Sequence, residues 1–212
     1  MFAVEERMVA YERWRADRDA AIESARRPSV RVQTATSWAA SAAEQGIDAE
    51  IAAASEIAIV EIPGGADRPR GPEFGTLVHA VLATVPLDAS DAIIRGTAET
   101  QGKILAASAV EVAAAIAVAS SVLKHDLLAR ARAASRVRRE TPVTWLQKDG
   151  TLIEGVLDLA FDEDGATTVV DFKTDHELAA AGEARYRAQL QQYINAVARA
   201  TGRPTTGVLF TI

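Results

Sequence analysis

The spacing of apolar residues changes once along the chain, from a helical period to the alternation that is typical of strands. Before residue 135, alanine, valine and leucine recur every three or four positions, as they do on one face of a helix. Residues 61–75 contain four glycines and three prolines and are expected to form a loop. Around this loop we expect helices over residues 4–26, 37–55, 74–85 and, as one long alanine-rich region, 90–134.

Three short strands are expected after the helices, over the segment TPVTWLQKDGTLIEGVLDLAFDEDGATTVVDFK. They are separated by Asp-Gly pairs at 149–150 and 164–165, and Asp-Gly between apolar runs favours a hairpin because both residues tolerate positive φ. A helix over about 181–200 and a buried strand over 206–212 follow, joined to the three strands by a crossover. This order predicts an α/β fold with a mixed β-sheet flanked by helices.

The length of 212 residues suits one substantial core with an appendage rather than two full domains. We expect a helical linker or appendage over residues 1–60 and the main domain over 61–212. The chain has no cysteine, which excludes disulfides, iron–sulfur clusters and Cys-ligated zinc and suits a cytoplasmic location. No signal-peptide pattern is visible in the first 19 residues, which are charged and amphipathic.

Two features could indicate a membrane or a nucleic acid as partner. Residues 104–123 carry one charge, Glu111, over the length of a membrane span, but they are mostly alanine, so a buried helix is the better interpretation and no membrane partner is expected. The net charge of −6 argues against a general nucleic-acid binder, because phosphate contacts need cations. Five arginines within residues 130–139 read as ordinary surface unless they border a site.

Charged residues interrupt the apolar strands at Asp158, Asp171 and Lys173. A tight turn at Asp164-Gly165 would place Asp158 directly opposite Asp171, where side chains of an antiparallel pair lie about 4.5–5.5 Å apart. Lys173 would share this face, because alternate residues of a strand point the same way. The other face would form a core from Leu157, Leu159, Phe161, Val170 and Phe172.

Two carboxylates at that distance repel each other, so a positive charge is needed between them. Lys173 could supply it in a purely structural ion cluster. A divalent cation held by both aspartates could supply it as well, and it would create a reactive site. The spacing alone leaves both interpretations open.

The segments GVLDLAF and VVDFKTD, with thirteen residues from Asp158 to Asp171, resemble the RecB-like branch of the PD-(D/E)XK nucleases. FGTLVHAVL resembles the upstream helix of that branch with its histidine, here His79, and YRAQLQQY resembles its Gln-x-x-x-Tyr helix, here Gln189 and Tyr193. The motifs keep the order found in that family and cover residues 71–212. The resemblance implies a restriction-endonuclease-like fold.

Residues 10–36 resemble the segment that joins the helicase core to the nuclease domain in RecB- and AddA-like helicase-nucleases. The resemblance therefore implies that the partner of this chain is a helicase motor, present as a domain or as a separate subunit. The chain itself has no phosphate loop of the form G-x-x-x-x-G-K-[ST] and carries no motor.

The resemblance also implies a Mg²⁺- or Mn²⁺-dependent deoxyribonuclease acting in DNA end processing, recombination and repair, with exonuclease action favoured over endonuclease action. The metal ligands would be Asp158, Asp171, the main-chain carbonyl of Phe172 and His79. A lone histidine on an apolar helix can also be an interior residue without a ligand role. Lys173 would orient the attacking water and stabilise the transition state.

Gln189 and Tyr193 lie one helical turn apart, and the resemblance places them beside the metal, in contact with Lys173, water or DNA phosphate. Tyr186 shares their face and is expected to be a core residue. Glu140 and Glu154 are expected to be structural or to support the site from outside. The alternative function is a non-catalytic DNA-binding or protein-docking module that keeps the nuclease fold, and a standalone restriction or recombination nuclease would share the same chemistry.

Overall fold

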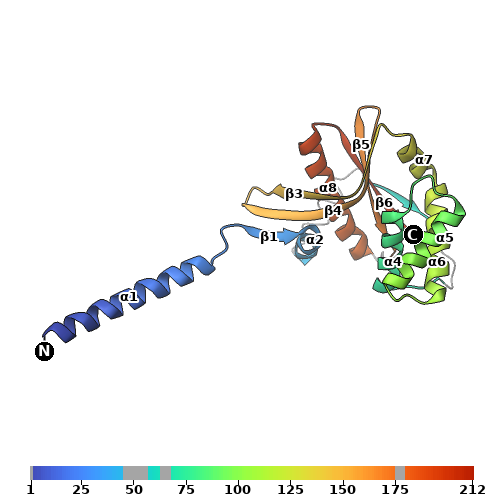
Figure 1. The fold of residues 1–212 in the computed structure, drawn as a ribbon. Helices are drawn as coiled ribbons and strands as arrows, with labels where there is room; N and C mark the ends of the chain where they lie inside the picture. The colour runs from blue at the N-terminus through green and yellow to red at the C-terminus, as the bar shows by residue number, and fades with distance from the viewer. Residues whose placement is uncertain (1, 45–56, 63–67, 175–179) are drawn as a thin grey trace.

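The computed structural model describes the chain except for residues 1, 45–56, 63–67 and 175–179. A mixed β-sheet lies between two layers of helices, as the sequence predicts (Figure 1). The strand order is β1-β4-β5-β6-β2, with β3 paired to β4 off this path. The strands are β1 (Arg31–Thr34), β2 (Ile57–Glu61), β3 (Arg136–Leu146), β4 (Thr151–Glu163), β5 (Ala166–Lys173) and β6 (Thr205–Thr211).

Strands β3, β4 and β5 form the antiparallel meander expected from the sequence, whereas β1, β6 and β2 pair in parallel with their neighbours. Strand β5 is joined to its parallel neighbour β6 through helix α8 (Ala180–Thr201), which confirms the expected crossover. This crossover carries α8 across one face of the sheet, where it contacts β3, β5 and β6.

Both Asp-Gly pairs lie at hairpin turns. At the β4–β5 turn, Asp164 and Gly165 both have positive φ, of 48° and 80°. The pairs in this hairpin run from Glu163 with Ala166 to Leu159 with Val170, which is the predicted register. At the β3–β4 turn only Gly150 of the pair has positive φ, of 82°.

Four helices cover the face of the sheet opposite α8: α4 (Pro72–Thr84), α5 (Asp91–Ile104), α6 (Ala109–Lys124) and α7 (Asp126–Ala133). The prediction of one long helix over 90–134 is wrong, because the chain bends at two places within it. Ala106 has a φ of 55°, after which Ser108 begins α6 with a capping box closed by Glu111. His125 then caps α7, its Nδ1 accepting a hydrogen bond from the Leu127 amide at 3.1 Å.

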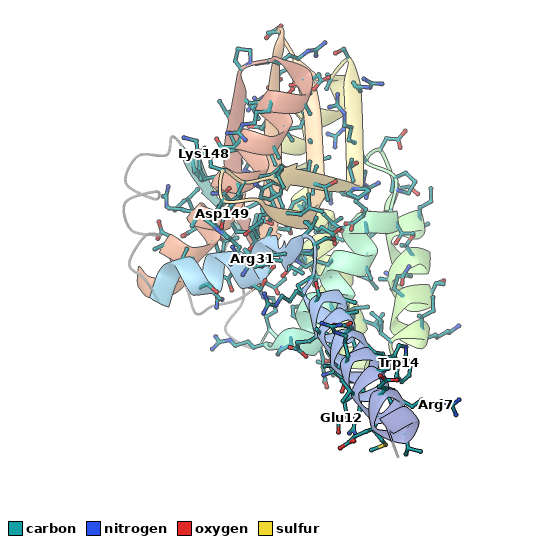
Figure 2. All side chains as sticks on the ribbon, turned by 90° about the vertical axis from the view of Figure 1, so that its left-hand side faces the viewer. Arg7, Glu12, Trp14, Arg31, Lys148 and Asp149 are labelled. Atoms are coloured by element: carbon teal, nitrogen blue, oxygen red, sulfur yellow. The ribbon has the colours of Figure 1, made fainter. Side chains whose placement is uncertain are left out.

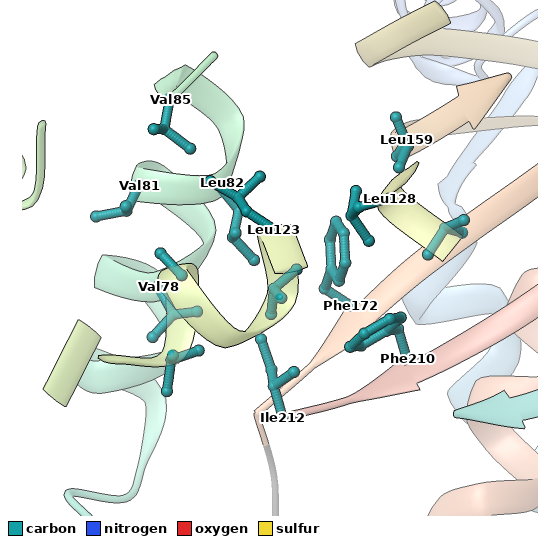
Figure 3. Close-up of a cluster of buried hydrophobic side chains, with 14 of the residues drawn as sticks. Val78, Val81, Leu82, Val85, Leu123, Leu128, Leu159, Phe172, Phe210 and Ile212 are labelled. Carbon is teal, nitrogen blue, oxygen red and sulfur yellow. The ribbon is translucent and has the colours of Figure 1, made fainter. Parts of the chain in front are cut away.

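The larger apolar cluster lies between these four helices and the sheet (Figure 3). Phe172 of β5 and Phe210 of β6 pack with ring centroids 5.5 Å apart, and both rings face the helices. Helix α4 contributes the apolar positions that its helical spacing predicts, namely Phe74, Leu77, Val78, Val81 and Leu82.

A second apolar cluster fills the opposite face, below α8 and helix α2 (Ala35–Glu44). Leu190, Tyr193 and Ile194 of α8 pack there against Ile153 and Leu157 of β4. The expectation that Leu157 shares a core with Leu159 and Phe161 is therefore wrong, because those two residues belong to the larger cluster.

The range 1–60 contains more than the helix expected there, since β1, α2 and β2 all contact the main body. Helix α1 (Phe2–Arg26) projects away from the rest, and its described side chains are exposed on all sides, as Arg7, Glu12 and Trp14 illustrate (Figures 1 and 2). Arg31 of β1 lies close enough to Asp149 of the β3–β4 turn to lower the pKa of its carboxyl, after the hydrogen bonds from Thr151. The division of the chain near residue 60 stays a prediction.

Among the helices of the described residues, none is by itself both long and apolar enough to cross a membrane. The bent pair α6 and α7, which meet at 63°, passes that test by length and composition only. The buried residues of this pair, including Val118, Val122 and Leu128, lie in the larger cluster.

Candidate active site

The site begins where β4 separates from β5. The ladder between these strands ends at Leu159 and Val170, so the next residues in the same register are Asp158 and Asp171. There the Asp158 carboxylate takes the place of a backbone partner, and its Oδ2 accepts a hydrogen bond from the Phe172 amide at 2.7 Å. A carboxylate is thereby fixed at the point where the sheet opens.

The regular alternation of β4 is interrupted at this residue. Leu157 and Leu159 lie in different apolar clusters, although residues two apart on a regular strand share one face. On the adjacent strand, Glu140 has a φ of 44°, and the β3–β4 ladder skips the pair it would form with Asp158. Positive φ is uncommon for a residue other than glycine and is often found at functional sites. The interruption places Asp158 between the two helical layers, where side chains from both can reach it.

Asp171 and Lys173 lie on the α8 side of the sheet and form an ion pair, with Lys173 Nζ 2.6 Å from Asp171 Oδ2. Both side chains are largely buried, at 5% exposed for Asp171 and 15% for Lys173. Burial alone would lower the pKa of Lys173, but the negative charges of Asp171 and Asp158 outweigh it and raise the pKa above the usual value. The lysine is therefore a protonated cation at neutral pH.

The Asp158 carboxyl is under-compensated. Burial, followed by repulsion from Asp171, raises its pKa to about 7, although Lys173 and the Phe172 amide act in the opposite direction. One lysine thus does not neutralise both carboxylates. The shift in the pKa of Asp158 means that half of these carboxyls would hold a proton near neutral pH.

His79 reaches the site from α4, on the other side of the sheet. Its Nδ1 lies 3.7 Å from Asp158 Oδ1, and its side chain is 34% exposed. Burial and the charge of Lys173 lower the pKa of His79, while Asp171 and the Phe172 backbone act against this. The imidazole is therefore neutral at pH 7 and keeps a lone pair for a ligand.

Gln189 and Tyr193 form the wall of the site on α8. Gln189 Nε2 lies 3.3 Å from the Tyr193 hydroxyl and 3.4 Å from Thr36 Oγ1 at the start of α2. Burial raises the pKa of Tyr193, so its hydroxyl remains protonated. Gly155 of β4 makes room for this ring, because a Cβ there would lie 2.8 Å from the Tyr193 hydroxyl oxygen.

These residues line a cleft of about 610 Å³ that opens beside the parted strands. Its walls come from the start of α2, the middle of β3, the first half of β4 and α8. Among the described lining residues the acids are Glu154, Asp158 and Asp171, and the one cation is Lys173. The cleft is therefore acidic and would repel a phosphate unless a further cation is present.

Every site residue expected from the sequence lies at or beside this cleft. Its lining residues include Asp158, Asp171, Lys173, Gln189 and Tyr193, while His79 and the backbone of Phe172 approach Asp158 from one side. Glu154 lines the cleft as well, and Glu140 lies close enough to Asp158 to help raise its pKa.

The participation of α2 is not indicated by any pattern in the sequence. Thr34 and Thr36 line the cleft and Thr36 contacts Gln189, yet both lie in a range expected to be an appendage. The arginines of the 130–139 segment have structural partners: Arg138 pairs with the buried Asp162, and Arg139 donates to the Val85 carbonyl. His176 lies outside the described residues.

The donors at this site fit a divalent metal ion. Two buried carboxylates with a single lysine leave negative charge uncompensated, and a neutral imidazole lies beside them. The Phe172 carbonyl points to the same strand edge as its amide, which bonds Asp158. In the part of the chain that the structure describes, no three acidic, histidine or cysteine side chains form a ready ligand cluster, so binding would draw these side chains closer together.

The comparisons with known proteins agree with this geometry. The sequence pattern of the PD-(D/E)XK nuclease superfamily matches residues 55–211. The first of the two subunits of an ATP-dependent helicase/nuclease from Bacillus cereus (strain ATCC 10987 / NRS 248) is 30% identical over 158 residues, which cover 62% of this chain. The protein of the same name from Streptococcus sanguinis (strain SK36) is 30% identical over 143 residues, again 62% of this chain.

This chain matches only a small part of those relatives, 13% of the Bacillus protein and 11% of the Streptococcus protein. The solved structure of SSO0001 aligns with 80% of this chain and 70% of its own, but its TM-score of 0.30 and identity of 14% are too low to inform on function. The superfamily match spans about three-quarters of the sequence and contains the cleft residues of β4, β5 and α8. The chain belongs to the PD-(D/E)XK nuclease superfamily.

Proposed function

We propose that this domain is a metal-dependent deoxyribonuclease that hydrolyses phosphodiester bonds in the cleft at Asp158, Asp171 and Lys173. The observation that carries the proposal is the meeting of these three groups, two carboxylates and a protonated lysine, in one cleft of a PD-(D/E)XK chain. Nucleases of this superfamily generally use divalent metal ions, and we propose Mg²⁺ or Mn²⁺ here.

Asp158, Asp171, the Phe172 carbonyl and His79 would hold the ion. When bound, it would polarise the scissile phosphate and lower the pKa of a water molecule. Its positive charge would also relieve the repulsion that raises the pKa of Asp158. The cleft would then accept a phosphate group that the acidic side chains otherwise repel.

Lys173 has the position and the charge to act on the reacting phosphate. It stays protonated, because Asp171 and Asp158 raise its pKa, and it lines the cleft. Its ammonium group would orient the attacking water and stabilise the negative charge that develops on the phosphate oxygens. Gln189 and the Tyr193 hydroxyl, which remain neutral, would orient Lys173, the water or a neighbouring phosphate.

The relatives named as helicase/nuclease subunits support a place for this domain beside a helicase motor. We therefore propose that it works in DNA end processing, recombination and repair, in the same chain as such a motor or in a complex with one. The acidic cleft fits this arrangement, because a motor would deliver DNA to a domain that attracts phosphates weakly. Exonuclease action and a cytoplasmic location stay predictions.

The test is cleavage of end-labelled single- and double-stranded DNA by the purified chain with Mg²⁺, Mn²⁺ or EDTA. We expect cleavage with either metal and none with EDTA. Asp171→Ala and Lys173→Ala should each abolish it, while Glu73→Ala, an exposed acid near the start of α4, should not. Undiminished cutting by either site variant would disprove the proposed roles, and binding of DNA without cleavage in any metal would favour the non-catalytic alternative.

A further inference from the structure

We propose that Tyr186 is a positioning residue for Lys173: its ring holds the ammonium group where the reaction needs it. Lys173 Nζ lies over the face of the Tyr186 ring, 5.0 Å from the centroid. A cation within about 6 Å of an aromatic centroid is attracted by the negative face of the ring. The sequence indicates only a core role for this tyrosine, and this inference rests on the proposed function of Lys173.

A lysine needs such a restraint more than most catalytic groups do. Its ammonium is a point charge at the end of a flexible four-carbon chain, and an ion pair with one carboxylate fixes its distance but not its direction. Asp171 holds Nζ at 2.6 Å, and the Tyr186 ring supplies a second and independent contact. Two contacts from different elements, β5 and α8, restrict the ammonium to a smaller region of the cleft.

Tyr186 is itself held firmly enough to serve as a support. Its side chain is buried in the smaller apolar cluster with Leu190 and Tyr193 of the same helix. Arg185 Nη2 donates a hydrogen bond to the Tyr186 hydroxyl at 3.1 Å, and the Arg185 guanidinium lies 4.9 Å from the ring centroid. The packing and the bond to the hydroxyl together fix the ring, and through it the lysine.

The surroundings strengthen the contact between ring and ammonium. Tyr186 is 8% exposed and the Lys173 side chain 15% exposed, so little water competes for the cation. Cation–π contacts are strongest where both partners are desolvated, and their loss at such a site corresponds to roughly 2- to 30-fold in rate if it falls on the transition state. Tyr186 therefore acts on the reaction through Lys173 without touching the substrate.

The position of Lys173 can be read directly by NMR, with or without a substrate. Protons above an aromatic ring are shifted upfield, and the chain has only four lysines, so selective ¹³C-lysine labelling gives a simple spectrum. We expect one ε-methylene signal with an upfield shift in the wild-type protein, which Lys173→Arg removes. The shift should persist in Tyr186→Phe and disappear in Tyr186→Leu.

Kinetics with a single-stranded oligonucleotide and Mn²⁺ provide the second readout. We expect Tyr186→Leu to lower kcat by about tenfold with little change in KM, while Tyr186→Phe, which keeps the ring, retains most of kcat. Ile194→Ala is the matched control, because it opens a cavity in the same apolar cluster away from Lys173. It should reduce the melting temperature as much as Tyr186→Leu does, without the fall in kcat.

Wild-type protein in which no lysine methylene is shifted upfield would overturn the proposal, whether or not the variants fold. Equal kcat losses in Tyr186→Leu and Ile194→Ala would also overturn it, since the effect would then come from packing. Both outcomes leave the proposed function intact if wild-type protein cleaves DNA. Absence of cleavage by wild-type protein, with the shifted signal present, would instead disprove the function and leave the contact established.

Discussion

Replacing Asp158 with asparagine should stabilise the metal-free protein at neutral pH while it abolishes cleavage. Burial and the charge of Asp171 raise the pKa of Asp158 from 3.8 to about 7. Because the folded-state pKa lies above the unfolded value, the native state binds this proton more tightly, and the free energy of unfolding falls as pH rises from about 4 to about 7. An asparagine carries no charge and avoids this loss.

The structure sets the size of the effect. A shift of about three pKa units corresponds to at most about 4 kcal/mol above pH 7, because each unit corresponds to about 1.4 kcal/mol. The Asp158 side chain is 14% exposed, so solvent screening is small, but its coupling to Asp171 and Lys173 reduces the gain. We expect Asp158→Asn to raise the free energy of unfolding by about 1–4 kcal/mol at pH 8.

The assay is urea unfolding of both proteins in EDTA from pH 4 to pH 8. The difference between variant and wild type should be near zero at pH 4 and should grow up to pH 8. Asp162→Asn is the control of opposite sign, because the Arg138 hydrogen bonds lower the pKa of the buried Asp162 to about 2. It should cost about 2 kcal/mol above pH 4 and lose this effect as pH falls toward 2. An Asp158→Asn protein no more stable than wild type at pH 8 would refute the reasoning.

Three further predictions concern parts of the chain outside the charged cluster. Deleting residues 1–26 should leave the melting temperature unchanged, because α1 is exposed, whereas deleting residues 1–44 should lower it, because β1 and α2 pack on the main body. Gly155→Ala should lower the cleavage rate about 10- to 100-fold by displacing the Tyr193 ring, with DNA cleavage as the assay. Ser108→Ala should cost about 1 kcal/mol in urea unfolding by removing the α6 capping box, and an unchanged midpoint would contradict this.

The sequence predicts the paired carboxylates because their geometry follows from local rules. The Asp164-Gly165 turn fixes the register of the β4–β5 hairpin, and the register brings Asp158 beside Asp171. Alternation along β5 then places Lys173 on the same face as Asp171. These steps need only the turn chemistry and the period of a strand, and both are visible in the residues.

The features that sequence patterns do not predict depend on contacts between distant segments. No periodic pattern indicates that Glu140 leaves the β region, so a regular strand assigns Leu157 to the wrong core. Thr36 contacts Gln189 across 153 positions of sequence, which no local rule reveals. The bend at Ala106 is hidden for a related reason, because alanine gives no stop signal within an alanine-rich region.

The central claim is that Asp158 and Asp171 together hold a divalent ion. The direct measurement is an anomalous difference map from crystals grown with MnCl₂. A strong manganese peak within bonding distance of both carboxylates, close to His79 and with Lys173 beside it, is the predicted result. Two aspartates that point apart, with no manganese between them at a saturating concentration, would contradict it.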